Sequence, residues 1–133
     1  MSIELTYLTL TALLAASLWI PYIIGVNKYE VAGDIYVRPT DMSQFPEWVH
    51  RAHRAHLNLL EQLLPFAVIV LIGQIQGIST PITAIVVTVF FWLRVAHAVG
   101  MISGLAKLPV RPMIYVAGWL CILVLGWEVL AVG

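Results

Sequence analysis

Four arginines stand out because they lie within or beside long apolar stretches, where charge is costly. They are Arg51, Arg54, Arg94 and Arg111. One acidic residue, Glu61, lies among them, so positive charge is left uncompensated. A guanidinium group binds a carboxylate through two parallel hydrogen bonds. This combination predicts a cationic, half-buried pocket that takes a small anion.

Helical spacing places these side chains on common faces. A rotation of about 100° per residue puts four polar residues of EWVHRAHRAHLNLLEQLLPF on one face, namely Arg51, Arg54, Asn58 and Glu61. Arg94 and His97 are three residues apart in FFWLRVAHAVGM. Arg111 and Tyr115 are four apart in PVRPMIY, and both spacings also share a helix face. These side chains, on three helices, are the candidate binding residues.

The same residues have a structural interpretation. Arg–Glu pairs and Asn hydrogen bonds hold the helices of a membrane bundle together. For any single residue the structural and the ligand-binding interpretation have equal support. For the set, the excess of four arginines over one intramembrane acid favours a ligand.

A row of histidines raises the question of a metal. His50, His53 and His56 repeat at three-residue spacing, and each step turns about −60° round a helix. Zinc and iron need converging ligands, whereas this row spreads over an arc of roughly 120° without a neighbouring Cys or Asp. We therefore predict no metal site.

The composition identifies the setting of these residues. The chain has 133 residues, of which 61% are hydrophobic and 11% charged. Soluble domains are typically about 45–50% apolar and about 25% charged. The seven basic and seven acidic residues give no basic excess, so we expect no nucleic-acid partner. The single cysteine, Cys121, has no partner for an internal disulfide. An integral membrane protein of one domain remains.

Apolar stretches of about 20 residues, the length that spans a membrane, occur four times. Helices are predicted at about 3–26, 47–76, 81–103 and 110–132, with a polar loop at about 27–46. Pro21 is expected to bend the first helix. The predicted fold class is an all-α integral membrane protein, a four-transmembrane-helix bundle forming a single domain over residues 1–133.

Lysine and arginine indicate the orientation, because they concentrate in cytoplasmic loops. The basic residues in or beside two of the connections are Lys28, Arg38, Arg51, Arg54, Lys107 and Arg111. The two chain ends and the Gly73–Pro81 turn carry none. We expect both basic loops, and the arginine pocket beside them, to face the cytoplasm, with both termini on the opposite side.

The segments RAHRAHLNLLEQLLPF, LRVAHAVG and LPVRPMIY resemble the MAPEG family, the membrane-associated proteins in eicosanoid and glutathione metabolism. The resemblance runs from about Glu47 to the carboxyl terminus. It implies trimers of four-helix subunits that bind glutathione between subunits, in sites open to the cytoplasm. Several members transfer or reduce hydrophobic substrates with glutathione.

The resemblance also implies roles for individual residues. Arg54, Asn58 and Glu61 match positions that contact glutathione. Arg94 and His97 match their counterparts on the next helix. Glutathione is accordingly the expected co-substrate.

Arg111 matches the arginine that stabilises the glutathione thiolate. An adjacent cation lowers the pKa of a thiol from its usual value of about 8.5 and so raises the nucleophilic fraction. The chain departs from well-studied members at Leu57, Met101 and Pro112, where these often carry a basic residue, carry a tyrosine and, in some members, carry a serine. Each change removes a polar contact to the tripeptide.

Three functions are compatible with these features. The leading hypothesis is a glutathione-dependent transferase or peroxidase acting on lipophilic electrophiles. The alternative is a non-enzymatic protein of the same fold that binds a lipid or an anionic metabolite in the cationic pocket. A small transporter or channel is disfavoured, because the charges cluster in one half of the membrane. Membrane lipids are expected to surround the chain, and two further copies are expected to join it in a homotrimer. Four short helices have little interior in which to bury the polar faces of three of them, and contacts between subunits would bury these faces.

Overall fold

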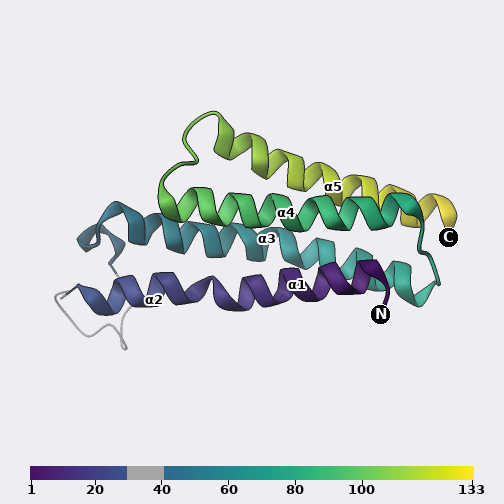
Figure 1. Ribbon diagram of the computed structural model, residues 1–133, viewed down its shortest axis with the longest axis horizontal. Helices are drawn as coiled ribbons and strands as arrows, with labels where there is room; N and C mark the ends of the chain where they lie inside the picture. The colour runs from purple at the N-terminus through teal and green to yellow at the C-terminus, as the bar shows by residue number, and fades with distance from the viewer. Residues whose placement is uncertain (30–40) are drawn as a thin grey trace.

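The computed structural model describes residues 1–29 and 41–133, and all regular secondary structure in them is helical. The elements are α1 (Ile3–Ser17), α2 (Trp19–Lys28), the 3-10 helix η1 (Met42–Gln44), α3 (Glu47–Ile75), α4 (Pro81–Ser103) and α5 (Val110–Val132). α1 and α2 follow one another along one rod, so four rods lie side by side (Figure 1). The prediction of an all-α, four-helix membrane bundle is confirmed.

The first rod is divided at Leu18, between α1 and α2. Pro21 has no N–H to donate, and its ring crowds the carbonyl of Ser17, four residues earlier. α1 therefore ends at Ser17, where the Leu18 N–H still bonds the Leu14 carbonyl at 3.0 Å. The sequence places the bend at the proline, whereas the break falls three residues before it, because a proline disturbs the turn that precedes it.

Each rod is long and apolar enough to cross a membrane. The four candidate spans contain 23 to 29 residues, or about 35–44 Å of helix, against a hydrocarbon core of about 30 Å. Large apolar side chains point outward along them, among them Leu64, Ile85 and Trp92, which are 58–71% exposed. Such a surface suits lipid rather than water.

The antiparallel packing gathers the connections at two ends of the bundle. The two termini and the α3–α4 turn lie at one end, and the α4–α5 connection lies at the other, with the start of α3 and the end of α2 (Figure 1). Lys28, Arg51 and Lys107 belong to this second end. Arg38, like most of the predicted loop at 27–46, lies outside the described residues.

An aromatic stack forms the centre of the core. The rings of Phe66 on α3 and Phe90 on α4 lie 4.0 Å apart, nearly parallel, and both residues are fully buried. Val87 and Leu125 belong to the same cluster, which joins α3, α4 and α5. Packing around this stack fixes the three helices that carry the candidate site.

Two acidic side chains are held at the end of the bundle that contains the termini. The carboxylate of Glu4 accepts hydrogen bonds from Ser79 Oγ (2.9 Å) and Thr83 Oγ1 (2.6 Å). Thr80 caps α4 and donates from Oγ1 to Glu128 at 2.9 Å. Carboxylates are stabilised near helix N-termini, so these acids have local partners far along the helices from the arginines.

Candidate functional site

A cavity of about 510 Å³ lies between α3, α4 and the start of α5. Its lining consists of Arg54, Asn58, His97, Leu108, Arg111, Pro112, Tyr115 and Val116. Five of the eight candidate residues are thus brought together: Arg54, Asn58, His97, Arg111 and Tyr115. Among the residues that the structure describes, the lining contains no acidic side chain. The other three candidates lie elsewhere.

On α3, Arg54 and Asn58 are one turn apart and both reach the cavity. Glu61 lies almost one turn further along but is exposed and does not line the cavity. The ion pair recorded within the described part of the chain joins Arg51 to Glu47, not Arg54 to Glu61. The expected Arg–Glu pairing therefore does not neutralise the cavity in this single chain.

α4 contributes one residue to the cavity wall and one beneath it. His97 is 2% exposed and lines the cavity, and its Nε2 has no hydrogen-bond partner among the described residues. Arg94 is 1% exposed and lies one turn deeper, outside the lining. Its Nη2 donates to the Ile114 carbonyl at 3.0 Å, and its guanidinium lies 5.7 Å from the ring of Phe90 and 5.9 Å from that of Tyr115.

α5 supplies the second cation of the cavity from its first turn. Arg111 and Tyr115, four residues apart, face the same way as the spacing predicts. Within residues 1–29 and 41–133, neither Arg54 nor Arg111 forms an ion pair. Two unpaired guanidinium groups in one partly enclosed space favour an anionic ligand that accepts hydrogen bonds from both.

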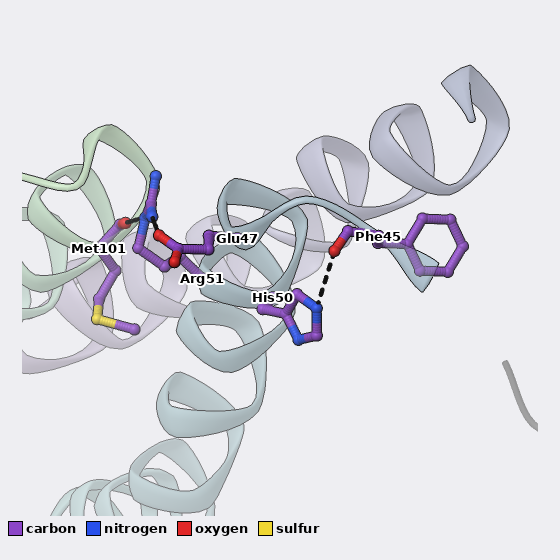
Figure 2. A network of polar contacts seen from close by, with 5 residues as sticks. All are labelled: Phe45, Glu47, His50, Arg51 and Met101. Carbon is purple, nitrogen blue, oxygen red and sulfur yellow. Dashed lines mark hydrogen bonds and ion pairs between the residues drawn. The ribbon is translucent and has the colours of Figure 1, made fainter. Parts of the chain in front are cut away.

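Arg51 lies at the end of α4 instead of in the cavity (Figure 2). Its Nε donates to the Met101 carbonyl at 3.1 Å, and its Nη1 lies 3.4 Å from a carboxylate oxygen of Glu47. The guanidinium covers Gly104, which ends α4 with a φ of 77°, and a Cβ at Gly104 would approach Nη2 to 3.2 Å. A cation here complements the helix C-terminus.

We predict that Arg51→Gln lowers the free energy of unfolding by roughly 1–2 kcal/mol, because a charged donor to a helix-end carbonyl is lost. Equilibrium unfolding in mixed detergent micelles measures this change in the free energy of unfolding. Glu47 is the matched control: its side chain is 95% exposed, so Glu47→Gln should change stability by less than about 0.5 kcal/mol. Equal losses in the two variants would contradict the role of the Met101 contact.

The histidine row makes contacts with its own surroundings. His50 Nε2 lies 3.2 Å from the Phe45 carbonyl, at the start of α3 (Figure 2). His53 stacks on Tyr22 of α2, with ring centroids 4.5 Å apart. Among the residues whose placement is described, no three His, Cys, Asp or Glu side chains are grouped as metal ligands.

The three departures from the family pattern fall in different places. Leu57 is exposed and lies outside the cavity lining. Met101 is 1% exposed, and its carbonyl accepts hydrogen bonds from Arg51 Nε and from the Gly104 N–H. Pro112 alone of the three lines the cavity.

An apolar groove of about 390 Å³ adjoins the cavity along α5. Its lining consists of Pro109, Pro112, Met113, Val116, Ala117 and Leu120. Pro112 and Val116 line both spaces. A polar compartment and an apolar one are therefore contiguous on one helix.

Two residues beneath the cavity were not anticipated from the sequence. Gln62, 4% exposed, donates from Nε2 to the Tyr115 carbonyl at 3.0 Å. Gly118 is buried against Gln62 and Arg94. An amide in an otherwise apolar membrane stretch is itself a signal, because polar groups there need partners, and this signal identifies Gln62. Nothing in the sequence marks Gly118.

These features define a multi-pass integral membrane protein with four spanning rods and a cationic cavity at one end of the bundle. The chain belongs to the MAPEG family, whose sequence model matches residues 6–131. This family includes glutathione transferases and peroxidases. The match confirms the resemblance and extends it over the first helix. No curated protein matches the chain significantly.

Proposed function

We propose that the protein is a membrane enzyme that binds glutathione in the cationic cavity and uses its thiolate on lipophilic electrophiles. The observation that carries the proposal is a pair of arginines, Arg54 and Arg111, which have no ion pair and no acidic neighbour in the lining within the described part of the chain. Glutathione presents two carboxylates and a thiol, and guanidinium groups are suited to bind carboxylates. Family membership supports the same chemistry.

Within this proposal each lining residue has a task. Arg54 and Asn58 bind the tripeptide by charge and by amide hydrogen bonds. The Nε2 of His97, which has no partner among the described residues, and the hydroxyl of Tyr115 offer further contacts from the cavity lining. Arg111 stabilises the thiolate, because a nearby cation favours the charged form of the sulfur.

Two reactions follow from a stabilised thiolate. In transfer, the sulfur attacks an electrophilic carbon, a C–S bond forms, and the leaving group departs with its electron pair. In peroxide reduction, the sulfur attacks the terminal oxygen of a hydroperoxide, an S–O bond forms as the O–O bond breaks, and the inner oxygen leaves as an alkoxide that takes up a proton to become the alcohol. A second glutathione then displaces water from the sulfenic acid and gives the disulfide.

The apolar groove supports a lipophilic second substrate. It shares Pro112 and Val116 with the cavity and extends along the outward face of α5, toward Leu120. A substrate tail lying there would bring its reactive end to the cavity from the bilayer. The proposal includes an active site that faces the cytoplasm, where the two basic connections are expected.

We also propose that the protein forms a homotrimer. Arg54 and Glu61 on α3 are exposed in the single chain. In lipid, exposed charges are costly, and burial between subunits would relieve this cost. The mass of the detergent-solubilised assembly decides between a monomer and a trimer.

Glutathione binding tests the proposal directly. We expect calorimetry on the purified protein to detect binding at or below millimolar concentration, with thiolate absorbance appearing at neutral pH. S-methylglutathione is the matched control ligand, because it retains both carboxylates but has no thiol to ionise. It should bind without the absorbance change. Absence of glutathione binding at millimolar concentration would refute the proposal.

Continuity of the cavity with the apolar groove favours a second candidate function. An amphiphile with an anionic head, such as a phospholipid, would place its head beside Arg54 and Arg111 and its tail along α5. The protein would then be a non-enzymatic binder of a lipid or an anionic metabolite. Native mass spectrometry distinguishes the two: a retained phospholipid without thiol chemistry supports binding, and a glutathione thiolate supports the enzyme.

A further inference from the structure

Two buried polar side chains from different helices converge on one turn of α5. Gln62 of α3 donates to the Tyr115 carbonyl, and Arg94 of α4 donates to the Ile114 carbonyl, both at 3.0 Å. A helical carbonyl that already accepts the N–H of the residue four positions later has a second lone pair free for such a bond. Neither donor lines the cavity. Their hydrogen bonds therefore hold the backbone of α5, not a ligand.

Gly118 makes this close approach possible. A Cβ at this position would lie 2.6 Å from Gln62 Oε1 and 2.7 Å from Arg94 Nη2, closer than a Cβ approaches the atoms of another residue in folded proteins. Any larger residue would displace one donor or both. Gly118 and the two donors thus form one contact, which we name the α5 clamp.

The α5 clamp holds the part of α5 that follows Arg111. Ile114 and Tyr115 follow Arg111 by three and four residues, so all three lie on one side of α5 within about 6 Å along its axis. The start of α5 has few other attachments: its buried residues begin at Gly118, and its N-cap makes no side-chain hydrogen bond. The α5 clamp therefore fixes the rotation and depth of the turn that carries Arg111.

We infer that Gln62 and Arg94 are positioning residues that hold the first turns of α5 so that the Arg111 guanidinium stays in the cavity. The inference rests on the proposed function of Arg111. It gives Arg94 a different task from the glutathione contact that the family resemblance implies. It also assigns a task to Gln62 and Gly118.

The test uses Gln62→Leu, which removes the donor, nearly preserves the volume and leaves the cavity lining intact. Without any ligand, hydrogen exchange of residues 110–117 should accelerate by at least about fivefold, because this turn loses an attachment. With glutathione and an activated aryl halide, kcat should fall by about ten- to a hundredfold through misplacement of Arg111. KM for glutathione should change less than about twofold, because the ligand contacts remain. Gln62→Asn, with a shorter amide, is the second variant should the first fold poorly.

Gln74→Leu is the matched control on the same helix. Gln74 accepts from Ser2 Oγ at 2.7 Å, at the opposite end of α3. This variant also loses a partly buried amide, so it shows how a loss of stability by itself affects hydrogen exchange and kcat. We expect exchange in residues 110–117 and kcat to stay at their wild-type values.

The readouts separate the inference from the proposed function. If the wild-type protein shows no glutathione chemistry, the proposed function fails, and hydrogen exchange alone decides the α5 clamp. Unchanged exchange in Gln62→Leu overturns the inference, as does a rise in KM with unchanged kcat. The double variant Gln62→Leu/Arg111→Ala should be no slower than Arg111→Ala alone, because the clamp acts through Arg111. Multiplied losses in the double variant would also overturn the inference.

Discussion

Arg111→Ala is expected to lower kcat/KM for glutathione conjugation at neutral pH by about 10²-fold or more, the scale typical when a preorganised charge-stabilising donor is removed. Arg111 lines the cavity and forms no ion pair within the described residues. Its positive charge is therefore available to a thiolate. Glutathione binding should weaken less than turnover, since Arg54, Asn58 and His97 remain. Steady-state kinetics of the purified protein with an activated aryl halide measures both quantities.

Raising the pH should partly restore the Arg111→Ala variant. A thiol without a neighbouring cation ionises near pH 8.5, so the variant gains thiolate from pH 7 to about 9 while the wild type, already ionised, gains little. Arg111→Lys keeps a positive charge without the planar guanidinium, so its turnover should lie between that of the wild type and that of Arg111→Ala. Lys107→Ala is the control, because Lys107 is a nearby exposed cation outside the cavity lining. A variant Arg111→Ala that binds glutathione and turns over within twofold of wild type would contradict the thiolate role.

The cavity shows which part of a site helical spacing predicts. Spacing assigns a side chain to a face, and Arg54 and Asn58, like Arg111 and Tyr115, do share the cavity as their faces require. Spacing does not say which neighbour covers that face at each depth. Arg94 shares a face with His97 but lies one turn deeper, where Ile114 and not a ligand accepts its hydrogen bond.

Glu61 illustrates the opposite limit. It lies on the predicted polar face of α3 yet is exposed in the single chain. The polar face of α3 is broader than the part that lines the cavity, so a residue at its margin is left uncovered. Arg51 is likewise on that face, but the end of α4 lies beside it and takes its hydrogen bond. Long-range contacts of this kind depend on where α4 ends, which the sequence pattern alone leaves open.

The fold was more predictable than the site, because the bilayer imposes the length of each helix. Four apolar stretches gave four rods. The exception is the break at Leu18, which depends on how a proline disturbs the preceding turn and not on hydropathy. The pairing of Phe66 with Phe90 was also not predictable, because apolar residues surround both in the sequence and their contact depends on the register of α3 against α4.

That pairing leads to the second large effect. Phe66→Ala should lower the free energy of unfolding by roughly 3 kcal/mol, the lower end of the range for buried Phe→Ala changes. The lower end applies because the unfolded helices remain in lipid, which is as apolar as the core, so loss of packing dominates. Phe66 is fully buried and stacks on Phe90 at 4.0 Å. Unfolding of the protein in mixed micelles, titrated with a denaturing detergent, measures the change.

Trp92 provides the control for this argument. It is 58% exposed on α4, so Trp92→Ala removes a larger ring from the lipid-facing surface but opens no internal cavity. If packing against protein stabilises the bundle, Trp92→Ala should cost less than about 1 kcal/mol although it deletes more apolar area. Similar losses for Phe66→Ala and Trp92→Ala would show that apolar area rather than packing holds the helices together. Because Phe90 also lies beneath the Arg94 guanidinium, Phe66→Ala should in addition loosen the support of the α5 clamp, whereas Trp92→Ala should not.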